Sequence, residues 1–193
     1  MQDWKEEARH KILSEAQHLF LERGYDRTSL QMIAEKAGVS KGSLYRCFTS
    51  KEELFYELTD SAAARLKALL VRLRGKRFDP ATGRREYQIF ESEEVISMLL
   101  EEKYGLLLIM EQAQGTRYED LRPGMIDMLA AKIAPMLAVD EENSLLLAQI
   151  MARNLIDGVV HILKNRLQPR DVRANLQRLL EYHTRGIDSL LKK

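Results

Sequence analysis

Apolar residues recur three and four positions apart along most of the chain, and this spacing constrains the fold more than any other feature. Leu, Ala, Glu, Lys and Arg dominate, while the alternating β-branched runs that are typical of strands are absent. The sequence therefore predicts an all-α fold of about nine helices. The apolar stripe of the first helix consists of Ala8, Ile12, Leu13, Ala16, Leu19 and Phe20.

Turn and capping residues divide residues 1–74 into four predicted helices. Gly24 is expected to end the first helix and Gly38 the second, because glycine adopts the left-handed conformation of a C-terminal cap at little cost. The fourth helix is long and covers residues 51–74. The expected N-terminal caps are Thr28, which forms a capping box with Gln31, then Ser40 and Ser50.

The segment over residues 75–91 is the best linker candidate, because it combines glycines and a proline with many charges. We therefore expect a helix-turn-helix domain over residues 1–50, a linking helix over residues 51–74, and a regulatory and dimerisation domain over residues 75–193. In this last domain Gly105 and Gly115 are expected to separate helices. Further helices are expected to begin near Ser92, Asp140 and Pro169.

Positive charge is concentrated in one short stretch. The net charge of the chain is only +1, and residues 1–60 carry nine basic and eleven acidic residues. Residues 36–51, by contrast, contain Lys36, Lys41, Arg46 and Lys51 with no acidic residue among them. A helix, a tight turn at Gly38 and a second short helix form the arrangement that places the second helix in the major groove of DNA. Any affinity for nucleic acid is therefore expected to come from this local charge.

Other classes of protein lack their usual signatures. A single cysteine, Cys47, rules out an internal disulfide framework, and no Cys/His spacing resembles a zinc site. The four histidines are scattered and no HExxH, GxSxG or P-loop motif occurs, so we expect no enzyme activity, cofactor or metal site. No signal peptide and no run of about 18 apolar residues is found, which predicts a soluble cytoplasmic protein without a membrane partner. A helical adaptor for other proteins is the alternative function.

The string TSLQMIAEKAGVSKGSLYRCFTSKEELF, residues 28–55, resembles the DNA-binding signature of the TetR family of bacterial regulators. It contains the IAxxAGVSKGSLYxxF core of that signature and the SKEEL that follows it, and the resemblance covers about 50 residues, 12–58. It implies a homeodomain-like three-helix DNA-binding domain and a larger helical domain that binds a small molecule. The implied function is that of a homodimeric repressor, which binds a palindromic double-stranded operator and is released by an unidentified effector.

The resemblance also implies individual roles. Four residues of the second short helix would face DNA, and Tyr45 and Lys51, with Thr28 and Ser29, would contact phosphates. The alternatives are that Ser43 and Tyr45 are ordinary surface residues, and that Cys47 is a packing residue and not a redox switch. The four residues that face DNA are Lys41, Gly42, Ser43 and Arg46.

The C-terminal part contains six of the eight methionines, which suit an adaptable apolar pocket but are also common in a plain core. The last two long helices suit a helical dimer contact. The candidate pocket residues are Met98, Tyr104, Met110, Gln112, Met128, Met151 and Asn154. The candidate dimer residues are Leu155, Gly158, Val159, Ile162, Leu176, Leu179 and His183.

Overall fold

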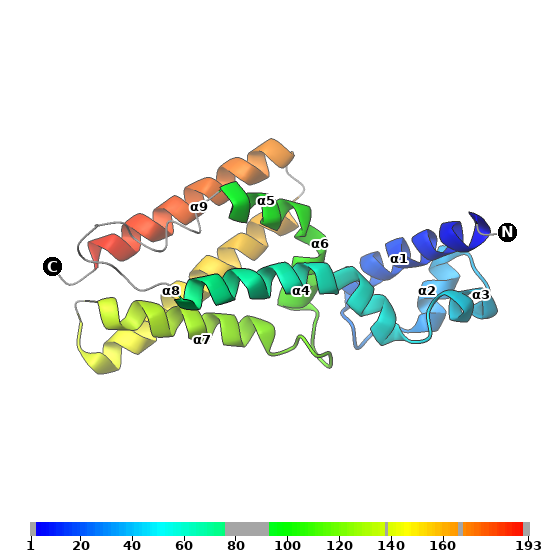
Figure 1. Cartoon of the computed structure of the whole chain (residues 1–193), viewed down its shortest axis with the longest axis horizontal. Helices are drawn as coiled ribbons and strands as arrows, with labels where there is room; N and C mark the ends of the chain where they lie inside the picture. Colours follow the sequence, from blue (N-terminus) through cyan, green and yellow to red (C-terminus); the bar gives the residue numbers. More distant parts are fainter. Residues whose placement is uncertain (1–2, 76–92, 138, 166–167, 191–193) are drawn as a thin grey trace. The chain divides into compact units, whose positions relative to one another are not determined.

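The computed structural model describes residues 3–75, 93–137, 139–165 and 168–190, and this part of the chain is helical without any strand (Figure 1). It contains nine α-helices, so the predicted fold class is confirmed. The linker candidate over residues 75–91 and the Ser92 cap lie almost wholly outside the described residues. By packing, the chain forms two compact units. The predicted division into functional domains at residue 75 does not concern packing units, and it stays a prediction.

The first unit consists of residues up to Ala64 together with Tyr104–Asp120. Its helices are α1 (Asp3–Arg23), α2 (Leu30–Ala37), α3 (Lys41–Cys47), the first part of α4 (Lys51–Gly75) and most of α6 (Lys103–Glu111). The stripe predicted on α1 supplies much of the core, since four of its six members are buried. The fully or almost fully buried side chains of this unit include Ile12, Ala16, Leu19, Phe20, Ile33, Leu44, Phe48, Leu54 and Phe55.

The predicted caps are confirmed at most of the helix ends. Gly24 follows α1 with φ +87°, and Gly38 ends α2 with φ +66°, its amide bonded to the Glu35 carbonyl. The Ser40 hydroxyl accepts the Ser43 amide at 3.1 Å, and the Ser50 hydroxyl accepts the Glu53 amide at 3.0 Å. These side chains satisfy amides that a helix start otherwise leaves unpaired.

The expected cap at Thr28 is wrong by one residue. The α2 cap is Ser29, whose hydroxyl accepts the Met32 amide at 3.2 Å. Thr28 is 2% exposed, and its hydroxyl donates to the Gly24 carbonyl at 2.8 Å. Gln31 does not complete a capping box, since its side-chain amide donates to the Glu35 carboxylate. Both residues are good caps by composition, so tertiary burial of Thr28 decides between them.

The second unit consists of Arg65–Lys103 and Leu121–Lys193. Besides the end of α4 it contains α5 (Glu93–Glu101), α7 (Leu121–Ile133), α8 (Glu141–Lys164) and α9 (Pro169–Ser189), with a 3-10 turn after α7. In this unit α8 packs against both α7 and α9 (Figure 1). The predicted starts of the last two helices are confirmed: the Asp140 carboxylate caps α8 by accepting the Asn143 amide, and Pro169 opens α9.

Helix α8 is long and apolar enough over Asn143–Lys164 to span a membrane by length and composition alone, with a mean hydropathy of 1.3. No such segment was expected, because the sequence contains no run of about 18 apolar residues. Asp157 forms an ion pair with Arg122 of α7 at 2.5 Å. The helix packs against α7 and α9, but only 22% of this apolar window is buried, and Leu145, Leu146 and Ile150 are exposed.

Gly105 does not separate two helices, as the sequence suggested. The break between α5 and α6 lies at Glu102, and Gly105 is a buried residue inside α6. A Cβ at this position would lie 2.8 Å from the Ala62 Cβ and 2.9 Å from the Leu58 carbonyl oxygen, both on α4. The glycine is therefore required by a close approach of two helices, which composition cannot distinguish from a helix end.

Replacing Gly105 with alanine is expected to reduce the free energy of unfolding by about 1–2 kcal/mol, because the clash with α4 outweighs the gain in helix propensity. Urea denaturation followed by circular dichroism measures the change. Gly124→Ala is the matched control, since a Cβ at Gly124 on α7 meets no atom within 4 Å. A Gly105→Ala protein as stable as the Gly124→Ala protein would contradict the close packing of α6 on α4.

Candidate nucleic-acid interface

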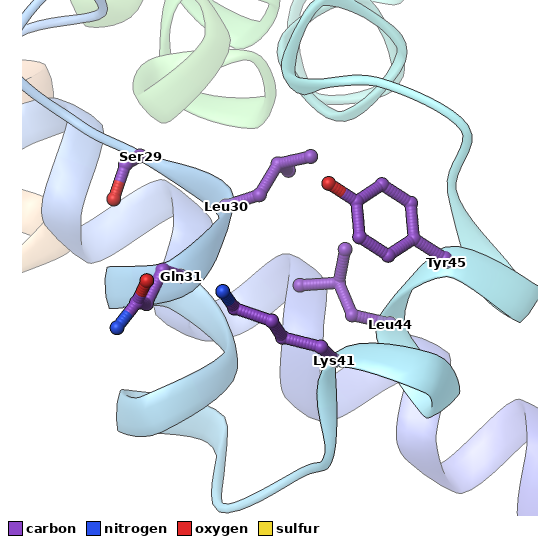
Figure 2. Close-up of a pocket in the computed structure, with 6 residues that line it drawn as sticks. All are labelled: Ser29, Leu30, Gln31, Lys41, Leu44 and Tyr45. Carbon is purple, nitrogen blue, oxygen red and sulfur yellow. The ribbon is translucent and has the colours of Figure 1, made fainter.

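A groove of about 310 Å³ lies between the start of α2 and the exposed side of α3. Figure 2 shows the Tyr45 hydroxyl directed toward Leu30, and Lys41 extended toward Gln31. Two helices that are separate in sequence thus present polar groups to one space. The residues that line the groove are Ser29, Leu30, Gln31, Lys41, Leu44 and Tyr45.

The electrostatics of this groove favour an anion. Neither α2 nor α3 has an acidic residue in its first turn, so no carboxylate offsets the positive end of the α2 dipole. The exposed Lys41 ammonium adds a full positive charge beside it. The donors at this groove are the free amides at the start of α2, the Lys41 ammonium and the Tyr45 hydroxyl. Donors of these kinds bind phosphate oxygens.

Helix α3 is divided into a buried and an exposed side. Leu44 is buried, as is the adjoining Phe48, which confirms the apolar side that was predicted. Cys47 is 8% exposed, as its interpretation as a packing residue predicts. The side away from the core carries the four residues predicted to face DNA: Lys41, Gly42 and Arg46 are exposed and Ser43 is half-buried. Tyr45 is 56% exposed, an unusual exposure for a large aromatic side chain.

Two of the predicted phosphate contacts lie elsewhere. Thr28 is buried with its hydroxyl bonded to its own backbone, while its neighbour Ser29 lines the groove. The Lys51 ammonium does not line the groove: it donates to the Tyr25 carbonyl at 2.8 Å and lies 4.0 Å from the centre of the Tyr25 ring. Burial lowers the pKa of Lys51 and raises that of Tyr25 to about 12. Their roles at DNA stay predictions.

Sequence reasoning missed two residues at the start of α1 that contact α3. The Trp4 ring lies 5.1 Å from the guanidinium carbon of Arg46. Arg9 donates to the Cys47 carbonyl at 3.1 Å, at the end of α3, and forms an ion pair with Glu57 of α4. These partners lie 38 to 48 residues apart in sequence, so no local spacing reveals them.

Known proteins resemble this chain in the segment that contains the groove and, at lower identity, over most of its length. Residues 12–58 match the family described as "Bacterial regulatory proteins, tetR family". The regulator AcrR of Shigella flexneri is 28% identical over 171 residues, which is 80% of this chain and 77% of that protein. The solved structure of NalD, the secondary repressor of the MexAB-OprM multidrug efflux pump in Pseudomonas aeruginosa, is 26% identical, covers 100% of both chains and has a TM-score of 0.52. Residues 12–58 are therefore a TetR-family DNA-binding domain.

With this TetR-family domain, the chain is accordingly a DNA-binding transcriptional regulator. TtgR of Pseudomonas putida is 45% identical over 56 residues, which is 29% of this chain and 27% of that protein. These relatives are transcriptional regulators and not enzymes, in agreement with the class of protein expected from the sequence.

The predicted pocket residues of this regulator fall into both compact units. Tyr104, Met110 and Gln112 belong to the first, where the Gln112 amide oxygen lies 2.9 Å from a Cβ built on Gly24. The remaining four belong to the second unit, where Met98 is buried and Asn154 is exposed. Met128 and Met151 are half-buried on α7 and α8. The seven predicted pocket residues are therefore divided into two groups, three in the first unit and four in the second.

The predicted dimer residues lie on α8 and α9, two helices that pack against each other within one chain. Leu155 and Leu176 are buried, and a Cβ at Gly158 would lie 2.9 Å from a methyl carbon of Leu179. Burial lowers the pKa of His183. The remaining members, Val159 and Ile162, are half-buried, like Gly158, Leu179 and His183.

A further cluster ties the loop after α6 to α4 within the first unit. Arg117 forms an ion pair with Asp60 at 2.5 Å, and its guanidinium lies 3.9 Å from the centre of the Tyr56 ring. The Tyr118 hydroxyl donates to the same Asp60 carboxylate at 2.7 Å. Burial, with this hydrogen bond, raises the pKa of Tyr118. The loop after α6 is therefore held to α4, the helix that follows α3.

Proposed function

We propose that this regulator is a repressor, which binds a palindromic operator as a homodimer and is released by a small molecule bound in its C-terminal part. The groove formed by the start of α2 with Lys41 and Tyr45 of α3 carries the proposal. It offers phosphate-binding donors next to an exposed helix face without acidic residues, the arrangement by which a helix-turn-helix is oriented on DNA.

In this proposal the groove binds the DNA backbone and α3 reads the bases. Ser29, the α2 amides and the Tyr45 hydroxyl contact phosphate, while Arg46 or Lys41 donates to guanine O6 and N7 in the major groove. Gly42 supports a close approach of DNA. A Cβ at Gly42 would contact only the Ser40 hydroxyl oxygen, at 3.9 Å, so packing within the chain does not require a glycine there.

Dimerisation is assigned to α8 and α9, because a palindromic site presents two equivalent half-sites. Leu155 and Leu176 would align the two helices within each protomer, since both are buried there. The half-buried members of the predicted set and the 71% exposed Tyr182 would meet the second copy.

Release is assigned to a movement of α4, the helix that follows the recognition helix. The segment Tyr104–Asp120 lies in the same compact unit as α1 to α3. It contacts α4 in two places, where Gly105 of α6 packs against α4 and where Arg117 pairs with Asp60. An effector that displaces this segment would therefore change the position of α4. For the protein to dissociate from the operator, the effector must bind the state that does not bind DNA more tightly than the DNA-binding state, by a few kcal/mol.

The proposal is tested by selecting the sequences that the protein binds from random double-stranded DNA, at a salt concentration typical of the bacterial cytoplasm. We expect a palindrome whose half-sites are about one helical turn or a multiple apart, bound by two chains as measured by light scattering. Recovery of no sequence preference would favour the alternative, a helical adaptor for other proteins. The selected site would also locate target promoters, whose genes would indicate the effector.

A further inference from the structure

The first turn of α1 contacts the DNA-facing side of α3 through an aromatic ring. The Trp4 ring lies 5.1 Å from the Arg46 guanidinium carbon, within the range of a cation–π interaction. Trp4 is 43% exposed, so the indole is not a core residue, and Arg46 is exposed as well. The two side chains therefore form a shared surface patch at the recognition helix.

The Arg46 side chain is also held from its own helix. Its guanidinium donates to the Ser43 hydroxyl at 3.1 Å, and the Ser43 and Ser40 hydroxyl oxygens lie 3.0 Å apart. Both kinds of partner, hydroxyl and indole, are uncharged. They fix the direction of the guanidinium without cancelling its charge, which a carboxylate partner would do.

The indole is kept in place by contacts between α1 and the end of α3. Arg9 donates to the Cys47 carbonyl and lies 4.4 Å from the centre of the Phe48 ring. The Cys47 sulfur lies 4.0 Å from the carbonyl oxygen of Lys5, the residue after Trp4. The position of the first turn of α1 relative to Arg46 is thus set by contacts with Cys47 and Phe48, which are both buried.

We propose that Trp4 is a positioning residue for DNA recognition, which holds the Arg46 guanidinium in the direction that it needs at the operator. A long side chain that is ordered before binding loses less conformational freedom on binding, and affinity rises accordingly. The start of α1 thereby becomes part of the DNA interface. This inference rests on the DNA contact of Arg46 in the proposed function.

A double-mutant cycle on the selected operator tests the inference. Trp4→Leu keeps an apolar side chain but removes the π face, and we expect it to weaken binding about three- to tenfold, with Trp4→Phe in between. In an Arg46→Ala background the same Trp4→Leu change is expected to alter the Kd less than about twofold. Urea denaturation of each variant checks that the fold is retained, as the exposure of Trp4 predicts.

The cycle has distinct outcomes. Tighter binding by Trp4→Leu would mean that the indole holds Arg46 away from DNA, and an equal loss in both backgrounds would mean that Trp4 acts only on the fold; either overturns the inference. If Arg46→Ala binds normally while Lys41→Ala does not, the inference fails but operator recognition by α3 stands. Normal binding by both alanine variants would overturn the proposed function itself.

Fluorescence gives a second readout, because Trp4 is the only tryptophan of the chain. We expect its emission to change in intensity or wavelength when the selected operator is added, and to stay unchanged with a scrambled duplex at the same concentration. Emission that is identical with and without bound operator would overturn the placement of Trp4 at the DNA interface.

Discussion

Phe55→Ala is expected to reduce the free energy of unfolding by about 3–5 kcal/mol, the largest single loss that we predict for this chain. Phe55 is fully buried on α4. Its ring makes edge contacts with Phe20 at 5.4 Å and with Tyr25 at 5.1 Å between ring centres. Removal of the ring leaves a cavity where α1, the following loop and α4 meet, and the faces of both other rings lose contact.

Denaturation in urea, followed by circular dichroism, measures this loss. Val71→Ala on the same helix is the control, because Val71 is 68% exposed and should change the free energy by less than about 0.5 kcal/mol. Phe55→Leu should fall between the two, since it restores part of the volume. A Phe55→Ala protein as stable as the Val71→Ala protein would contradict the central place of the Phe20, Tyr25 and Phe55 rings in the core of the first compact unit.

Lys41→Ala is expected to weaken binding to the selected operator about tenfold or more, with an unchanged fold. One good base or backbone contact contributes about 1–3 kcal/mol, and a dimer loses it twice. Lys41 is exposed and lines the groove, so its removal leaves the core intact. Gel-shift titrations at several salt concentrations measure both the affinity and its salt dependence, whose slope should fall by about one for each phosphate contact removed.

Lys11→Ala removes the same charge elsewhere and is the matched control. Lys11 lies exposed on α1, where its ammonium pairs with Glu7 at 2.7 Å. We expect its operator affinity to remain within about twofold of the original, because an exposed pair of this kind contributes little. Equal losses for Lys41→Ala and Lys11→Ala would show that net charge, and not the groove, accounts for the affinity.

Local signals in the sequence predicted most of the secondary structure correctly. The apolar stripe of α1, the glycine ends at Gly24 and Gly38, and the Ser40 and Ser50 caps depend on residues within four positions of one another. Such short-range patterns are read directly from a single chain. The buried side of α3, with Leu44 and Phe48, was predicted for the same reason, whereas the residues expected to face DNA were implied by the resemblance to the TetR signature.

The sequence by itself thus determined most of the helices, the TetR-like DNA-binding segment and the acid-free charge of the stretch that contains α3. Only the tertiary structure decided that Ser29 and not Thr28 caps α2, that Gly105 lies inside α6 against α4, and that Trp4 contacts Arg46. The physical reason is the same in each case. These outcomes depend on which surfaces pack together across tens of residues, whereas capping and periodicity depend on neighbours along the chain.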